Sequence, residues 1–437
     1  MPNHDKMKKV FFILCVFLPS LLQAQQTLLL RSAIDSTLRN SFDIRIARNN
    51  TEINTLNYSF GNAGGLPSVG ITVSDNTALN TPDQKFKNGS ETNYSNSLDN
   101  NVNAGIYTSM TLFNGFKIIA DYRRLRMLQE QSELLLNDMI QSKVADVMIA
   151  YFDIIRQQRY LKIIESTLAI SEKKLEIVQQ RDSVGMASGV DIMQAQMDVN
   201  IALQNQETQK MIIEQSKTDL LALMSSKTYY SFIVDDSISV DPGIGADSVL
   251  NALKNNPQYM IAEKQTHISE QLMKEVNAQR YPSVKISAGY NFDRSESDKA
   301  ALYFGQVYGP SAGLTLQIPI YNGNAVRRHV KAARIEIMNA QLRTENTMND
   351  LTSNAVKAYQ SYSTAIRQLN RQQENYILAG KLMNLVLENF QVRQATILDV
   401  KAAQSSFENA AYSLVNTQYV AKLAEIQLQS LIFKLKY

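Results

Sequence analysis

Alternating apolar and polar residues occur in two pairs of segments, one pair in each half of the 437-residue chain. The pattern predicts strands over about residues 66–77 and 102–113, and over about 282–293 and 308–320. In each segment the apolar residues fall on one face and the small or polar residues on the other. A strand of a membrane barrel requires this alternation over roughly 10 residues, and so does a half-buried strand of a soluble sheet.

The segments between the strands favour the membrane interpretation. Residues 76–101 are rich in Asn, Ser and Thr and predict a long loop, and residues 294–305 predict a charged loop. Aromatic residues gather near both ends of the predicted strands, as they do at the two edges of a membrane barrel, although aromatic residues beside turns are also common in soluble sheets. They are Phe113, Tyr281 and Tyr321 at one end, and Tyr303, Phe304 and Tyr308 at the other.

Long helices follow each pair of predicted strands. Residues 116–180 contain no Pro or Gly, and Gly380 is the only Gly or Pro in residues 325–390. Apolar residues spaced alternately by three and four, such as Met383, Leu387 and Phe390, predict helices that coil around their neighbours. On the first long helix, Ile163, Ile170 and Ile177 form a second apolar line beside the one that contains Leu161, Ile164 and Leu168. Two lines on one helix predict neighbours on both sides, and a wide core face in a helical bundle is the alternative. Return helices are expected at about 190–225 and 398–433, and shorter helices near 32–58 and 248–279.

The two halves of the chain repeat one pattern. Leu38-Arg39-Asn40 recurs 215 residues later as Leu253-Lys254-Asn255, and Val190-Asp191 recurs 208 residues later as Leu398-Asp399. A loop that is longer in the first half explains the difference in spacing. We therefore predict repeat 1 over 25–225, a linker over 226–247 and repeat 2 over 248–437.

Residues 1–24 predict a secretory signal peptide. Three lysines precede an apolar run over 10–22, and this run is too short to span a bilayer. Removal of the signal would also remove Cys15, the one cysteine. No later segment approaches about 18 consecutive apolar residues, so we expect any entry into a membrane to use strands. The net charge is only +3, which disfavours nucleic acid as a partner.

Each long helix is expected to end in a tight turn that leads into its return helix. Ser188 with Asp191, and Thr396 with Asp399, have the spacing of a capping box. Gly185 suits the left-handed position that ends a helix. A structural role is sufficient to explain these residues, and the functional alternative is a gate or docking point at the tip. The candidate residues are Gly185, Ser188, Asp191, Phe390, Arg393, Thr396 and Asp399.

A second pair of turns should connect strand to helix. Phe113-Asn114-Gly115 in the first half corresponds to Tyr321-Asn322-Gly323 in the second. Both lie between the last predicted strand and the long helix of their half. We therefore predict that Asn114, Gly115, Asn322 and Gly323 form the strand-to-helix turns.

Together these motifs resemble the TolC family of outer-membrane efflux proteins over essentially all of the mature chain. The resemblance implies a mainly α fold with a membrane β-barrel contribution, built from long antiparallel coiled-coil helices, four strands per chain and an internal two-fold repeat. It further implies a homotrimer that closes a 12-strand barrel and a 12-helix tunnel. Such a protein lies in the outer membrane, extends into the periplasm, and exports drugs or secreted proteins with an adaptor protein and an inner-membrane pump.

The sequence departs from this family at the tip. Where many relatives carry Tyr and Arg residues that help to close the tunnel, this chain has Phe390 and Ala395, and Arg393 replaces the second glycine. Asp191 and Asp399 match the tip carboxylates of the family, but a further acid is replaced by Ala402. The residues that make the usual polar links are therefore not all present, and Arg393 is a candidate replacement for one of them.

No catalytic or metal-binding pattern occurs in the sequence. His267 and His329 are the only histidines after the signal, and each is isolated on a predicted helix. There is no phosphate-binding glycine-rich loop and no His-Glu-x-x-His motif. We therefore expect a protein that is not an enzyme and needs no cofactor. The alternative to an export duct is a periplasmic or surface coiled-coil scaffold, whereas a hydrolase would need catalytic residues that the sequence lacks.

Overall fold

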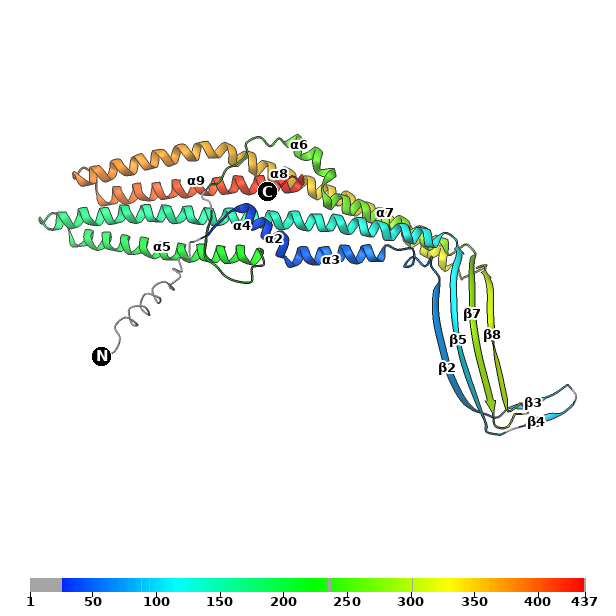
Figure 1. Cartoon of the computed structure of the whole chain (residues 1–437). Coiled ribbons are helices and arrows are strands. Elements are labelled where there is room, and N and C mark those ends of the chain that lie inside the picture. Colours follow the sequence, from blue (N-terminus) through cyan, green and yellow to red (C-terminus); the bar gives the residue numbers. More distant parts are fainter. Residues whose placement is uncertain (1–25, 88, 94, 235–236, 301, 436–437) are drawn as a thin grey trace, which may run out of the picture. The chain divides into compact units, whose positions relative to one another are not determined.

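The computed structural model describes residues 26–87, 89–93, 95–234, 237–300 and 302–435 (Figure 1). The predicted signal peptide at 1–24, with Cys15, lies outside these residues. The chain divides into two compact units. The first unit contains the segment up to Arg45, Met139–Ala252 and the segment from Thr352 on, and the second contains Ile46–Asp138 and Leu253–Leu351. Each unit therefore takes segments from both halves of the sequence.

The second unit contains an antiparallel four-stranded sheet. Its strands are β2 (Ser68–Asn80), β5 (Ser97–Asn114), β7 (Ser283–Ser297) and β8 (Phe304–Gln317), in the order β2-β5-β7-β8 (Figure 1). Ile71 pairs with Ile106, which pairs in turn with Tyr290. The register confirms that the alternating apolar residues share one face, here called the apolar face. The opposite face, called the small-residue face, carries mainly Ser, Gly, Thr and Asn side chains.

The long loop predicted over 76–101 is wrong in part. β2 and β5 continue into it as far as Asn80 and Ser97, and it contains a hairpin of β3 (Asp83–Lys85) and β4 (Glu91–Asn93). Polar side chains support this pairing, because Asn80 Nδ2 donates to Asp99 Oδ2 at 2.7 Å. The alternation of apolar residues ends before the strands do, since backbone pairing does not require apolar side chains.

The other strand ends also differ from the prediction. β7 continues to Ser297, and β8 begins at Phe304 and ends at Gln317. The predicted strand residues 318–320 are therefore not part of β8. Pro319 has no N–H group to donate to a ladder, which disfavours continuation. Tyr308 lies inside β8, where it pairs with Phe292, rather than at the strand end as expected.

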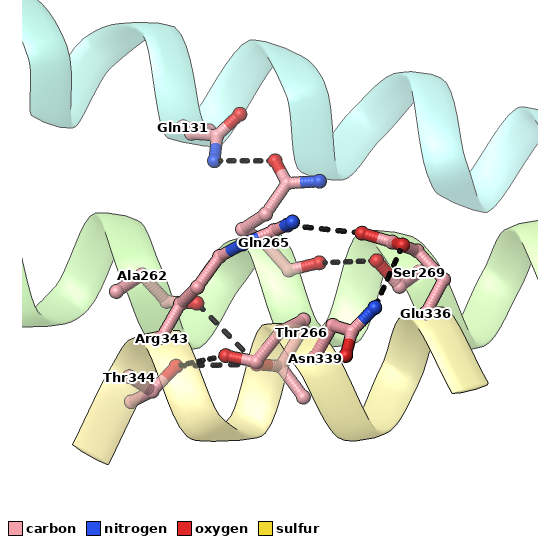
Figure 2. A network of polar contacts seen from close by, with 10 residues as sticks. Gln131, Ala262, Gln265, Thr266, Ser269, Glu336, Asn339, Arg343 and Thr344 are labelled. Carbon is pink, nitrogen blue, oxygen red and sulfur yellow. Dashed lines mark hydrogen bonds and ion pairs between the residues drawn. The ribbon is translucent and has the colours of Figure 1, made fainter. Parts of the chain in front are cut away.

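Helices of the second unit pack through polar contacts. They belong to α3 (Phe42–Asn57), α4 (Lys117–Asp182), α7 (Pro257–Ala278) and α8 (Ala325–Gln391), of which α3, α4 and α8 continue into the first unit. In Figure 2, Gln131 of α4 reaches Gln265 of α7 at 3.1 Å, and Thr266 of α7 reaches Thr344 of α8 at 3.3 Å. Lys264 of α7 also pairs with Glu130 of α4 at 2.9 Å. α7 therefore contacts both α4 and α8 within this unit.

Both predicted short helices are interrupted. Residues 32–58 form α2 (Leu30–Asn40) and α3, separated at the buried Ser41. Residues 248–279 form the end of α6 (Ala246–Ala252), a 3₁₀ turn and α7, which begins at Pro257. The side chain of Asn256 caps α7 by accepting from the N–H of Gln258 at 2.8 Å. The Asn-Pro pair is a breaker that the prediction overlooked.

The first unit is a helical bundle with a small parallel sheet. It contains the later parts of α4 and α8, together with α2, α5 (Gly189–Leu223), α6 and α9 (Ile397–Leu431). The predicted linker over 226–247 includes β6 (Phe232–Val234), which pairs in parallel with β1 (Gln26–Leu28). Phe232 and Val234 are buried against the helices. None of the described helices is apolar over a length that could cross a bilayer.

Residues of the predicted apolar lines are buried on the long helices. Tyr362, Met383 and Phe390 are buried on α8, and Ile177 and Val178 are buried on α4. α4 and α8 contain 66 and 67 residues, and each return helix contains 35. The predicted helix ends lie within three residues of these bounds, because Gly, Ser and Thr delimit the turns.

Candidate gate at the helix tips

Two tight turns connect the long helices to their return helices. The first tip comprises residues 183–191 and the second tip comprises residues 392–399. Below them, α4, α5, α8 and α9 share one apolar cluster, which therefore holds both tips in a common packed structure. Its buried members are Ile177, Val178, Ala195, Met383, Phe390, Val400 and Ala403.

Both predicted capping boxes are present. The N–H of Asp191 donates to Ser188 Oγ at 3.2 Å, and the N–H of Ser188 donates to Asp191 Oδ2 at 3.3 Å. In the second tip, the N–H of Asp399 donates to Thr396 Oγ1 at 3.2 Å, and the N–H of Thr396 donates to Asp399 Oδ2 at 2.8 Å. Each carboxylate thus satisfies a helix N-terminus and is held in a fixed position.

Gly185 and Arg393 occupy equivalent left-handed positions. Gly185 has φ +71° and Arg393 has φ +70°. The residue after each donates its N–H to a carbonyl five residues earlier, from Met186 to Arg181 at 2.8 Å and from Gln394 to Asn389 at 2.7 Å. This hydrogen bond is typical of a helix that ends in a left-handed residue. Glycine adopts the conformation freely, whereas arginine must strain its Cβ against the backbone.

Replacing Arg393 with glycine should therefore stabilise the protein by about 0.5–1 kcal/mol. The side chain of Arg393 is exposed, so little packing would be lost. Gly185→Ala is the matched control and should destabilise by a similar amount. Thermal unfolding in detergent measures both, and a less stable Arg393→Gly variant would show that the Arg393 side chain makes a contact that outweighs the strain.

Arg181 joins the ends of the two long helices. Its Nη2 donates to the carbonyl oxygen of Phe390, and its guanidinium carbon lies 4.1 Å from the centre of the Phe390 ring. Phe390 is only 1% exposed, so the candidate gate residue is a core residue in this chain. Arg181 could not be identified from local sequence patterns, because its partner lies 209 residues away.

Asp399 is exposed at the second tip and ionises readily. The backbone and side-chain hydrogen bonds from Thr396 hold the pKa of the Asp399 carboxyl below its usual value. The group should therefore carry its full negative charge at neutral pH. Asp191 is half-buried and belongs to the first tip, Ala395 is half-buried, and Ala402 is exposed.

We expect Asp399→Asn to lower the preference of the open channel for cations, measured as the reversal potential across a planar bilayer. The amide keeps a hydrogen-bond acceptor for the cap but removes the charge. Because the pKa of Asp399 is lowered, the wild-type preference should persist until the pH falls below the ordinary range of an aspartate. Unchanged selectivity in Asp399→Asn would reject Asp399 as a pore carboxylate.

The strand-to-helix turns belong to the second unit, whereas the tips belong to the first unit. Gly115 has φ +67° and Gly323 has φ +63°, and the residue after each glycine is also left-handed. A Cβ on Gly115 would lie 2.5 Å from the carbonyl oxygen of Ala278, whereas a Cβ on Gly323 would meet nothing within 4 Å. Glycine is thus favoured at both turns by conformation, and at Gly115 it is also required by space.

A buried polar line on α4 was not anticipated. Ser171 and Lys174 occupy core positions, where Ser171 accepts from Gln404 Nε2 at 3.1 Å and Lys174 pairs with Asp198. Burial raises the pKa of the Asp198 carboxyl, but the hydrogen bond and the charge of Lys174 outweigh it, and the pKa lies below its usual value. Nearby, burial raises the pKa of Tyr412 to about 12. Polar residues at core heptad spacing are the signal that could have revealed this line.

The described residues contain no group of three or more His, Cys, Asp or Glu side chains that could hold a metal ion. The two carboxylates of the tips are engaged in helix caps, and the buried pair Lys174–Asp198 is an ion pair. The tips therefore offer charged and apolar side chains for contacts with other molecules.

Comparison with known protein families assigns the chain to a class of outer-membrane protein. The sequence profile of the outer membrane efflux protein family matches residues 33–226 and 249–432. The chain belongs to this family, which confirms the resemblance drawn from its motifs. Membership defines it as an outer-membrane exit duct for exported molecules.

Two named relatives show the extent of the similarity. The chain is 23% identical to outer membrane protein TolC of Vibrio cholerae over 301 residues, which are 67% of this chain and 68% of that protein. It is 22% identical to the solvent efflux pump outer membrane protein SrpC of Pseudomonas putida over 408 residues, or 90% of this chain and 83% of SrpC. The match to TolC of Escherichia coli spans 61% of that protein, which is less than two thirds of its length.

Solved structures share the fold. The outer membrane protein VceC of Vibrio cholerae has a TM-score of 0.75 at 15% identity, covering 92% of this chain and 95% of VceC. The CmeC outer membrane channel of Campylobacter jejuni has a TM-score of 0.74 at 16% identity, covering 92% and 85%. The names of SrpC and CmeC describe efflux and a channel, which is consistent with the expectation that the chain is not an enzyme.

Proposed function

We propose that three copies of this chain close into a 12-strand barrel continued by a 12-helix tunnel, which serves as a passive duct. The sheet carries the argument. β2 and β8 are its outermost strands, so each has an edge with no partner among the described strands of the chain. Four strands are too few to close a barrel, which takes about eight. Pairing of β8 with β2 of another copy would satisfy both edges.

The chemistry of the two faces supports this assembly. The apolar face exposes residues such as Ile71, which is 75% exposed, and Leu314. An exposed apolar surface of this kind suits the hydrocarbon of a bilayer. The small-residue face then lines the lumen, where small polar side chains leave space for cargo and water. We infer that repeat 1 and repeat 2 are copies of one ancestral sequence, and each would contribute two strands to the barrel.

The duct would act with an adaptor protein and an inner-membrane pump. The sequence has no phosphate-binding glycine-rich loop to supply energy from a nucleotide. The helical tips, which end in exposed Val184, Met186 and Val392, offer an apolar surface to a periplasmic partner. The duct would thus be passive and would open or close at the tips in response to its partners.

We favour small apolar or aromatic compounds as cargo. SrpC and the toluene efflux pump outer membrane protein TtgI, both from Pseudomonas putida, are each aligned with 90% of this chain. The proteases secretion protein PrtF of Dickeya chrysanthemi also matches 90% of it, at 18% identity, so secreted proteins are the second candidate. Deletion of the gene should increase sensitivity to organic solvents if the first assignment holds, and should abolish secretion of a protein if the second holds.

Extraction and mass measurements test the assembly. We expect the mature protein to leave the membrane only with detergent, to have the mass of a trimer by light scattering, and to conduct ions in planar bilayers. A monomer in mild detergent would contradict the proposal. Release by salt without detergent would instead support the periplasmic or surface scaffold.

A further inference from the structure

One aromatic ring lies on the small-residue face of the sheet. Tyr107 of β5 is the only aromatic residue on this face in the described parts of β2, β5, β7 and β8, and it is 43% exposed. Its cross-strand partners are Gly70 on β2 and Gly289 on β7. The ring is therefore surrounded by residues that are much smaller than itself.

Glycines allow this ring to lie flat against the sheet. A Cβ on Gly105, two residues earlier on the same face, would lie 2.7 Å from both Cζ and the hydroxyl oxygen of Tyr107. A Cβ on Gly289 would lie 3.1 Å from Cδ1 of the same ring. Because both distances are shorter than ordinary contacts, the ring extends along β5 over Gly105 and beside Gly289 in space that any other residue would occupy.

The space in front of the ring is open. Tyr107 borders a depression that is lined largely by hydroxyl-bearing and glycine residues of the same face, including Ser109, Ser287 and Ser311. A ring forced away from Gly105 would enter this open space. It would then project from the wall instead of covering it.

We propose that Tyr107, held flat by Gly105 and Gly289, sets the bore of the lumen and presents the face of its ring to passing cargo. This inference rests on the proposed function, in which the small-residue face lines the duct. In a trimer, three such rings would lie at one level of the wall. Each would offer a surface for stacking to aromatic molecules while leaving the passage wide.

Gly105 is the better of the two glycines for a test. The atoms that a Cβ on Gly105 would meet are the far end of the Tyr107 side chain, which can rotate away. A Cβ on Gly289 would also lie 2.8 Å from the carbonyl oxygen of Ile106, so that its effect on pairing could not be separated from its effect on the ring. Gly70 and Gly309 lie on the same face and have nothing within 4 Å of an added Cβ, which makes them matched controls.

The experiment measures the bore by exclusion of neutral polymers in planar bilayers. Poly(ethylene glycol) of graded mass is added to the compartment that faces the β3–β4 hairpin, so that the helix tips do not limit its entry. Gly105→Ala should shift the cut-off to smaller polymers and reduce the entry of a polymer near the cut-off by about two-fold or more. Gly70→Ala and Gly309→Ala should keep the wild-type cut-off.

A double variant shows whether the ring causes the change. Gly105→Ala combined with Tyr107→Ala should restore entry to at least the wild-type level, because the displaced ring is absent. A narrowed cut-off that persists in the double variant would overturn the proposal, and so would a wild-type cut-off in a folded Gly105→Ala trimer. Failure of the wild-type protein to form any channel would instead reject the proposed duct.

Discussion

Replacing Arg181 with alanine should raise the open probability of the channel by about 10- to 30-fold, which corresponds to about 1.4–2 kcal/mol. Arg181 donates to the carbonyl oxygen of Phe390 and covers its ring. A cation over an aromatic ring contributes about 0.5–2 kcal/mol, and a hydrogen bond from a charged donor about 1.5–3 kcal/mol. These contacts join the end of α4 to the end of α8, so an opening that separates the two tips must break them.

Single-channel recording at fixed voltage checks this expectation. Lys173→Ala is the matched control, because Lys173 is an exposed basic residue of α4 that pairs only with Glu176 one turn away among the described contacts. It should leave the open probability unchanged. Arg181→Lys should have an intermediate effect, since lysine keeps the charge but lacks the planar group that stacks on a ring. Equal open probability in Arg181→Ala and wild type would show that the two tips move as one body.

This link also changes the interpretation of the tip departures. The resemblance implies closing contacts at the end of α8 and on the second tip, where Phe390 and Ala395 replace Tyr and Arg. In the structure, a cation from the first half of the chain reaches the second half, and Phe390 supplies its ring and its carbonyl group. The guanidinium group is thus supplied by the first half of the chain instead of the second. The two long helices remain linked although the usual Tyr and Arg are absent. Arg393, the predicted replacement, is exposed instead.

The sequence predicts the long-period features of the fold because these repeat over many residues. Apolar spacing over more than 60 residues defines α4 and α8, and alternation defines the central parts of the four strands. The capping boxes could be predicted since Ser188 with Asp191, and Thr396 with Asp399, act within four residues. The structure of such a motif is determined by residues that are close together in the sequence, so it can be predicted without knowledge of distant contacts.

Features that depend on distant partners could not be predicted. β1 and β6 contain three residues each and pair across about 200 residues of chain, so neither has a detectable period. The ends of β2 and β5 are mainly polar, and Leu79 with Leu98 is the one cross-strand pair of large apolar residues there, so the alternation is too sparse to predict strands. Arg181 has no local partner that would distinguish it from any other surface arginine. Lys174 lies at a core heptad position of α4, but its carboxylate partner lies on another helix and could not be identified from the sequence.

Asp198→Asn should destabilise the protein by about 3–5 kcal/mol, since it leaves a buried ammonium group without its counter-charge. The side chain of Lys174 is 0% exposed and that of Asp198 is 11% exposed. Gln194 also donates to Asp198 Oδ1 at 2.9 Å, so the carboxylate is held from two helices. Lys401→Met is the control, because Lys401 is 55% exposed and 3.5 Å from Asp198, and its loss should cost less than about 1 kcal/mol.

The pH dependence separates the charge of Asp198 from its packing. The pKa of Asp198 is lowered in the folded protein, so its stabilising effect is fully present above the ordinary pKa of an aspartate and is lost as the pH falls through the folded value. The difference in unfolding free energy between wild type and Asp198→Asn, followed by circular dichroism in detergent, should therefore shrink as the pH is lowered. A difference that stays constant down to acid pH would assign the effect to shape rather than charge, and Lys174 would then have to be stabilised by groups other than Asp198.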